Sequence, residues 1–252
     1  MRAARAGAAV LRAGGLPKPG AAAEVKGLGD YVTAADRNSE AAILEVLARE
    51  APGIPVLAEE RGGLRASTMW AVDPLDGTTN FTRGFATAAV SVGLLEQGRP
   101  AVGVVIAPFL DLEFAVSRGS GAFLNREPLQ RLRRVDPSRA ILATGYPFRN
   151  KARLPRYLRV MEPVLERFED IRRTGAAALD LAWTAAGTFD GYFELSLKTW
   201  DLAAGAALVM EVGGVVSDWS GGDAWIESGD VLAASPAVHE ALLEIAAKTA
   251  EG

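Results

Sequence analysis

The sequence predicts a mixed α/β protein built in two lobes, and two observations support this. The first half carries apolar runs separated by short turns, which is typical of antiparallel strands. The second half alternates short apolar runs with helical patterns, which is typical of a sheet covered by helices. The polar segment Arg131–Asp136 separates the two patterns. We therefore expect an N-terminal lobe over residues 1–135 and a C-terminal lobe over residues 136–252.

Two helices are expected at the start of the N-terminal lobe. An Ala-rich stretch over about 2–13 predicts the first, which ends before a pair of glycines. Thr33 followed by Asp36 predicts the start of the second, because residues of these types at this spacing satisfy each other's free backbone N–H groups. This helix is expected to end near Glu50, before Pro52. The strands of this lobe are expected at 55–58, 69–72, 86–95, 101–107, 113–117 and 121–124.

The segment between these two helices, residues 16–30, is rich in Gly, Pro and Lys and is predicted to be a loop. It is either a plain linker or a lid that brings Lys26 to a phosphate. The residues themselves leave both interpretations open.

The C-terminal lobe is predicted from its alternation of patterns. Strands are expected near 140–144, 170–172, 189–195, 215–217 and 231–234, and helices over 151–168, from 175, over 200–212 and from 236. Gly213 and Gly214 end the third of these helices, and Pro236 begins the last.

Composition restricts the class of protein. The chain has 252 residues, of which 49% are hydrophobic and 23% charged, and its formal net charge is −4. This balance lacks the basic excess typical of nucleic-acid binding, so nucleic acid is not expected as a partner. Gly, Pro or charged residues interrupt every apolar run before it reaches membrane-spanning length. The N-terminus also lacks the zones of a signal peptide, so we expect a cytoplasmic protein that does not associate with membranes.

The chain contains no cysteine and one histidine, His239, which falls in the C-terminal helical pattern and is expected to pack or lie at the surface. The absence of cysteine excludes disulfides, thiolate metal sites and cysteine-nucleophile phosphatase chemistry. A multi-histidine zinc site and a histidine nucleophile are not expected either. Any bound metal would need oxygen ligands, which favours Mg²⁺ or Mn²⁺.

The segment Asp73-Pro74-Leu75-Asp76-Gly77-Thr78-Thr79-Asn80 follows an apolar run that is expected to be a buried strand. Pro74 fixes one φ angle, so the carboxylates of Asp73 and Asp76 are expected on a stiff turn. The Gly-Thr-Thr-Asn run is typical of a helix start, whose free N–H groups favour an anion. Acids beside an anion site need cations to offset their repulsion, which indicates metal-dependent phosphoryl chemistry. A solvated turn in which Asp76 only caps a helix explains the segment equally well.

Other acids stand where strands end or helices begin. Glu59 and Glu60 follow the strand expected at 55–58, and one of the two is expected to face a site at the strand ends. Asp36 either caps its helix or also supports such a site. Asp201 begins a helix and is able to close a metal site from the second lobe, and Glu194 on the preceding strand is placed to meet substrate hydroxyl groups.

Taken together, these segments resemble the inositol monophosphatase family, and its bacterial branch in particular. Residues 73–80 resemble the first family signature, and Trp200-Asp201-Leu202-Ala203-Ala204-Gly205 resembles the second. Ala58-Glu59-Glu60 is similar to the metal-binding Glu-Glu element, and residues 32–36 to the helix-start element. Residues 172–182 and 145–148 resemble the bacterial branch. The match covers nearly the whole chain in the right order.

The resemblance implies a layered α-β-α-β-α fold of the inositol monophosphatase and fructose-1,6-bisphosphatase type. It also implies a homodimer that hydrolyses phosphate monoesters with Mg²⁺ and that is sensitive to lithium. Lys26 would match the family's mobile-loop lysine, although the loop here is shorter, and residues 61–68 also form a short segment.

The resemblance also assigns roles to individual residues. The metal ligands would be Glu59, Asp73, Asp76, Asp201 and the main-chain carbonyl of Leu75. Glu59 and Thr78, the latter supported by Asp36, would orient the attacking water. The amides of Gly77 and Thr78 would hold the phosphate, and Glu194 and Ala177 would contact the alcohol part of the substrate.

Several functions remain open at this point. The leading hypothesis is hydrolysis of a small phosphorylated polyol or sugar, above all inositol 1-phosphate. Fructose 1,6-bisphosphate and 3′-phosphoadenosine 5′-phosphate are rival substrates, and Glu194 favours a polyhydroxy ring over a nucleotide. Aspartyl-phosphate hydrolases are less suitable, because they place two acids at i and i+2 near the first strand. The third alternative is a dimer that binds a transcription-associated partner.

Overall fold

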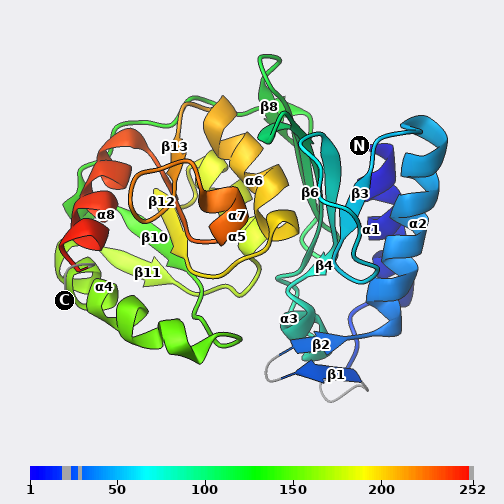
Figure 1. The fold of residues 1–252 in the computed structure, drawn as a ribbon, viewed down its shortest axis with the longest axis horizontal. Helices are drawn as coiled ribbons and strands as arrows, with labels where there is room; N and C mark the ends of the chain where they lie inside the picture. The colour runs from blue at the N-terminus through cyan, green and yellow to red at the C-terminus, as the bar shows by residue number, and fades with distance from the viewer. Residues whose placement is uncertain (19–23, 28–29, 250–252) are drawn as a thin grey trace.

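Five layers stack in a computed structural model that describes residues 1–18, 24–27 and 30–249 (Figure 1). Helices α1 and α2 cover the outer face of a seven-stranded sheet, and α5 and α6 lie between this sheet and a five-stranded one. Helices α4 and α8 cover the far face of the second sheet. This arrangement confirms the predicted layered α-β-α-β-α fold.

The first layer pairs α1 (Arg2–Gly14) with α2 (Ala34–Glu50). Gly7 allows this close approach, because a Cβ there would lie 2.7 Å from both Ile43 Cδ1 and Ser39 Oγ. The start of α2 is the predicted capping box: the Thr33 hydroxyl accepts from the backbone, and Asp36 accepts from the Thr33 N–H at 2.7 Å. The other carboxylate oxygen of Asp36 lies 3.1 Å from the Thr78 hydroxyl.

The seven-stranded sheet follows sequence order. Its strands are β3 (Val56–Ala58), β4 (Met69–Asp76), β5 (Ala89–Glu96), β6 (Arg99–Ala107), β7 (Leu112–Ser117), β8 (Ala122–Leu124) and β9 (Glu127–Pro128). Neighbours pair antiparallel, as the turn-separated apolar runs predict, except that β3 and β4 are parallel. The central strands are apolar on both faces because helices cover both faces.

The five-stranded sheet has the order β11-β10-β12-β14-β13. Its strands are β10 (Ile141–Thr144), β11 (Asp170–Arg172), β12 (Gly191–Glu194), β13 (Val215–Ser217) and β14 (Val231–Ala234). The helices of this half are η1 (Pro137–Arg139), η2 (Lys151–Arg153), α4 (Leu154–Arg167), α5 (Ala177–Ala186), α6 (Thr199–Glu211), α7 (Trp225–Ser228) and α8 (Pro236–Lys248). Strand β10 pairs parallel with β11 and β12, and the remaining pairs are antiparallel.

Helix α6 belongs to the second half of the chain but packs on the first sheet. A Cβ at Gly93 of β5 would lie 2.7 Å from Ala203 Cβ, and one at Gly103 of β6 would lie 2.5 Å from the Ala204 carbonyl oxygen. The small residues on both sides bring the start of α6 against the end of β4. In the sequence, the strands of the first sheet precede residue 135 and those of the second sheet follow residue 136. The division into two lobes at that point stays a prediction.

Three features differ from the sequence-based expectations. Strand β4 continues to Asp76, with an irregular register between Asp73 and Asp76, so both acids lie within the strand and not on a turn after it. Strands β1 (Glu24–Gly27) and β2 (Asp30–Val32) pair inside the expected loop. Strand β9 and helix α7 were not predicted, since such short elements have no detectable period. The side chain of Lys26 lies outside the described residues, so its role stays a prediction.

Among residues 1–18, 24–27 and 30–249, we find no helix with the length and apolar character needed to cross a bilayer.

Candidate active site

Three buried aspartates from distant parts of the chain converge between the two sheets. Asp73 and Asp76 come from the end of β4, and Asp201 comes from the first turn of α6. One carboxylate oxygen of each lies within 4.8 Å of the others. The convergence follows from the fold, because the glycine and alanine contacts above seat α6 on the first sheet.

Glu59 joins this cluster from the neighbouring strand. Because β3 and β4 are parallel with Ala58 opposite Val72, the residues that follow them lie at the same edge of the sheet. The Glu59 N–H donates to the Val72 carbonyl at 3.0 Å. Its carboxyl group is close enough to Asp73 and Asp201 for the charges of these acids to act on one another. Of the adjacent acids Glu59 and Glu60, the first is therefore the one that reaches the cluster.

The four acids have unusual protonation behaviour. Burial raises the pKa of Asp73, Asp76 and Asp201, and burial together with the negative charge of Asp201 raises the pKa of Glu59 to about 7. For Asp73 and Asp76, the negative charges of neighbouring acids raise the pKa further. A cation among these oxygens would reverse this effect, because it stabilises the ionised forms.

Backbone N–H groups hold the three aspartates in place. Asp73 Oδ1 accepts from Leu75 N–H at 2.9 Å, and Asp201 Oδ2 accepts from Lys198 N–H at 2.7 Å. Asp76 accepts from two N–H groups at the start of α5. Buried, fixed carboxylates with no nitrogen or sulfur among them are the donor set that Mg²⁺ or Mn²⁺ prefers, so the residues fit such an ion.

A second contact chain joins Asp36 to the same edge. The Thr78 hydroxyl lies 3.1 Å from Asp36 Oδ1 and 3.0 Å from the Leu75 carbonyl oxygen. Asp36 is fully buried and also accepts from the Thr33 hydroxyl at 2.6 Å. The structure thus brings Asp36, Leu75 and Thr78 together.

Gly77 connects β4 to α3 (Thr78–Thr82) in a left-handed conformation with φ +85°. A Cβ there would lie 2.9 Å from the Thr87 carbonyl oxygen, so both conformation and space require glycine.

Glu194 ends β12 on the other side of the cluster. Its carboxylate accepts from the Tyr192 hydroxyl, and burial raises its pKa to about 7. The negative charge of Asp201 also raises this pKa, while Arg173 and Arg149 lower it. A Cβ at Gly145 would overlap the Glu194 carboxylate, so this glycine leaves the space that the acid fills.

Ala177 begins α5 beside Asp76, and its predicted contact with substrate stays a prediction. Its N–H donates to Asp76 Oδ1 at 3.2 Å, and its side chain is buried. Contact with a substrate would therefore have to come from the small side chain.

The structure adds residues to which the sequence reasoning assigned no individual role. Asn80 Nδ2 donates to Thr87 O at 2.7 Å and to Thr174 O at 2.9 Å, which ties the end of the first signature to the loop before α5. Buried Asp180 accepts from the Thr174 hydroxyl at 2.6 Å. Both lie in segments that the resemblance singled out, and a polar residue in an otherwise apolar helix is the signal that marks Asp180.

Arg173 is the third such residue. Its guanidinium carbon lies 5.8 Å from the ring centroid of Tyr146 and 5.5 Å from that of Phe148. These contacts hold a positive charge near Glu194, a relationship between separate segments that no spacing in the sequence reveals.

The chain is similar to known proteins of one family along nearly its whole length. The profile of the inositol monophosphatase family matches residues 1–251. The putative Nus factor SuhB of Neisseria meningitidis serogroup B is 40% identical over 244 residues, which cover 96% of this chain and 93% of that protein. Nus factor SuhB of Escherichia coli strain K12 is 41% identical over 224 residues, covering 88% and 84%.

Solved structures of similar proteins have the same fold as this chain. The inositol monophosphatase from Anabaena (Nostoc) sp. PCC 7120 superposes with a TM-score of 0.86 at 37% identity, covering 98% of this chain and 92% of its own. The extragenic suppressor protein SuhB from Bartonella henselae superposes with a TM-score of 0.88 at 36% identity, covering 97% and 95%. The four converging acids, the layered fold and these matches lead to one conclusion: the chain belongs to the inositol monophosphatase family.

Proposed function

We propose that this protein is a Mg²⁺-dependent phosphate monoester hydrolase that acts on a small phosphorylated polyol or sugar, with inositol 1-phosphate as the leading substrate. The observation that carries the proposal is the meeting of Asp73, Asp76 and Asp201 within 4.8 Å, beside Glu59 at the end of the neighbouring strand. The proposal includes a lithium-sensitive homodimer, as the family resemblance implies, and a cytoplasmic location, as expected from the sequence.

The metal ligands in this proposal are the four acids and the Leu75 carbonyl oxygen. Bound there, Mg²⁺ or Mn²⁺ makes water more acidic and offsets negative charge on the phosphate oxygens. The buried acids carry mutually repelling charges, so cation binding and local order should be coupled.

Thr78, Asp36 and Glu59 orient the attacking water in this mechanism. When the Thr78 hydroxyl donates to Asp36, its oxygen lone pairs are free to accept a proton of the water. The carboxylate of Glu59 is able to accept a hydrogen bond from the other O–H of the water. The amides of Gly77 and Thr78 hold the phosphate.

Glu194 and Ala177 contact the alcohol part of the substrate. A carboxylate accepts hydrogen bonds from hydroxyl groups, and this property favours a polyhydroxy ring over a nucleotide. Fructose 1,6-bisphosphate and 3′-phosphoadenosine 5′-phosphate remain the alternatives on the same fold.

A phosphate-release screen tests the proposal. Inositol phosphates, fructose 1,6-bisphosphate and 3′-phosphoadenosine 5′-phosphate are each incubated with the wild type in Mg²⁺ and in EDTA, with and without Li⁺. We expect release from inositol 1-phosphate that EDTA abolishes and Li⁺ reduces. Release that persists in EDTA, or release from none of the substrates, would contradict it.

A partner-binding role is the second candidate, because relatives at 40% and 41% identity are named Nus factors. The turn before β9 and the segment between the two sheets expose several arginines in a chain of net charge −4, namely Arg126, Arg131, Arg133, Arg134 and Arg139. Such a basic segment suits a transcription-associated partner with acidic groups. Binding of nucleic acid there would contradict the expectation that nucleic acid is not a partner. Capture of RNA polymerase components from lysate by an inactive Asp76→Asn variant, and no capture when these arginines are replaced by serine, would support this role.

A further inference from the structure

The short connection between Glu194 and Asp201 contains a strained residue. Strand β12 ends at Glu194 and helix α6 begins at Thr199. Ser196 in this turn has φ +67°, a left-handed conformation that costs free energy for any residue with a Cβ. Such a conformation persists only where surrounding contacts enforce it.

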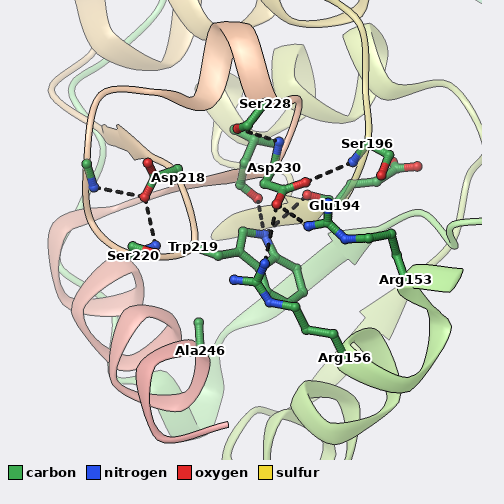
Figure 2. A network of polar contacts seen from close by, with 12 residues as sticks. Arg153, Arg156, Glu194, Ser196, Asp218, Trp219, Ser220, Ser228, Asp230 and Ala246 are labelled. Atoms are coloured by element: carbon green, nitrogen blue, oxygen red, sulfur yellow. Dashed lines mark hydrogen bonds and ion pairs between the residues drawn. The ribbon is translucent and has the colours of Figure 1, made fainter. Parts of the chain in front are cut away.

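The loop that leads into β14 supplies those contacts (Figure 2). Asp230 Oδ1 accepts from Ser196 N–H at 3.1 Å. The Leu197 N–H donates to Gly229 O at 2.9 Å. A Cβ at Gly229 would overlap the Leu197 carbonyl oxygen, so the two backbones lie in direct contact. The turn after Glu194 is therefore fastened to residues that precede β14.

The second carboxylate oxygen of Asp230 pairs with the start of α4. Asp230 is 7% exposed, and its Oδ2 accepts from Arg153 and lies 3.5 Å from Arg156 Nη1. The Arg156 guanidinium carbon lies 5.3 Å from the Trp219 ring centroid. The two arginines compensate the buried negative charge, which would otherwise be costly.

Trp219 holds the same strand end from another side. Its Nε1 donates to Glu194 O at 3.2 Å and to Val231 O at 3.1 Å (Figure 2). Asp230 and Trp219 thus form a brace around the main chain of Glu194. The position of Asp201 does not depend on this turn, because α6 packs along the first sheet. Glu194, in contrast, is the last residue of its strand.

We propose that Asp230 is a positioning residue that holds the 195–198 turn and thereby sets where the Glu194 carboxylate meets the hydroxyl groups of the substrate. This inference rests on the proposed function of Glu194. Asp230 itself has no contact with the reacting atoms in this role.

The test compares Asp230→Ala with Asp230→Ala/Ser196→Gly. We expect the first variant to raise the KM for inositol 1-phosphate by about fivefold or more with kcat within about twofold, because the loss falls on substrate binding. Gly adopts positive φ without a Cβ penalty, so the double variant should recover most of that loss. Hydrolysis of p-nitrophenyl phosphate, which lacks ring hydroxyls, should change little in either.

A matched pair at Ser196 addresses the turn if Asp230→Ala does not fold. Ser196→Val is expected to raise the KM for inositol 1-phosphate, because a β-branched residue disfavours positive φ, and Ser196→Gly to leave it unchanged. Glu244→Gln serves as the control. It removes an ion pair at 2.5 Å with Arg167 at the opposite end of α4, and KM should not move.

Hydrogen exchange of the 195–198 amides gives a readout besides activity. Faster exchange in Asp230→Ala, with recovery in the double variant, supports the inference. Unchanged KM and unchanged exchange, equal losses on both substrates, or no recovery by Ser196→Gly would overturn it while the proposed function stands. A folded wild type that releases phosphate from no polyol phosphate overturns the proposed function, and with it the substrate part of this inference.

Discussion

Asp76 Oδ2 accepts the Ala178 N–H at 2.8 Å, and this bond joins the end of β4 to the first turn of α5 across 102 residues of sequence. The same carboxylate is one of the three that meet within 4.8 Å. One side chain therefore fastens the second half of the chain to the first and takes part in the candidate metal site.

Asp76→Asn separates these two contributions. We expect Mg²⁺-dependent phosphate release to fall below detection, because an amide is a poor ligand for Mg²⁺ and carries no charge. The fold should persist, since the Asn oxygen still accepts an N–H of α5 and a repelling charge is removed. Phosphate release and circular dichroism measure both effects, with Asp223→Asn, an exposed acid, as the control. Full activity in Asp76→Asn would exclude this cluster as the site.

Metal removal should destabilise the wild type. A ligand that binds only the folded state stabilises it by about 2.7 kcal/mol at one hundred times its Kd. We therefore expect the Tm in EDTA to rise when Mg²⁺ is added in excess, and the rise to be absent in Asp76→Asn. Thermal unfolding with a Mg²⁺ titration measures this. An equal rise in both proteins would mean that the ion binds elsewhere.

Thr78 offers a test of water orientation. Thr78→Val removes the hydroxyl that lies between Asp36 and the Leu75 carbonyl, and kcat should fall by about 100-fold or more. Thr78→Ser keeps the hydroxyl and should retain most of the activity. Steady-state kinetics on inositol 1-phosphate distinguish the two, and similar losses in both variants would point to packing of the Thr78 methyl group as the cause.

His239 predicts how stability depends on pH. The imidazole is buried with Nε2 2.8 Å from Ser217 Oγ, and burial lowers its pKa below the ordinary 6.5. Below pH 6.5 the unfolded chain binds a proton at this residue that the folded protein does not, so the free energy of unfolding decreases as pH falls. Above that pH, both states are neutral and the contribution is constant.

Urea unfolding between pH 7.5 and 5 measures this effect as the difference between wild type and His239→Gln. The difference should change in the direction that favours the variant as pH falls. A difference independent of pH would show that His239 titrates alike in both states.

Gly103→Ala tests how α6 packs on the first sheet. Its new Cβ would lie 2.5 Å from the Ala204 carbonyl oxygen, and such overpacking costs about 1–3 kcal/mol. Because α6 carries Asp201, the affinity for Mg²⁺ should decrease as well. Gly14→Ala is the control, since nothing lies within 4 Å of a Cβ there and alanine favours helix. Chemical denaturation and metal titration measure both, and a stable Gly103→Ala with unchanged metal affinity would contradict this account.

The sequence alone determined most elements and the chemical character of the candidate site. Apolar runs with turns between them located the first sheet, and strands at 170–172, 215–217 and 231–234 match the structure in full. The capping box at Thr33 and Asp36 also formed as predicted, because it depends on neighbouring residues. The absence of cysteine and the series of acids at strand ends restricted a metal site to oxygen ligands.

Only the tertiary structure decided how these parts meet. The continuation of β4 through Asp76 and the pairing of β1 with β2 depend on partner strands, so no local pattern predicts them. The positive φ of Ser196 and its bond to Asp230 join residues 34 positions apart. Local order follows from short-range backbone preferences, whereas the spacing of carboxylates in a site follows from the packing of whole layers, and packing is a property of the folded chain.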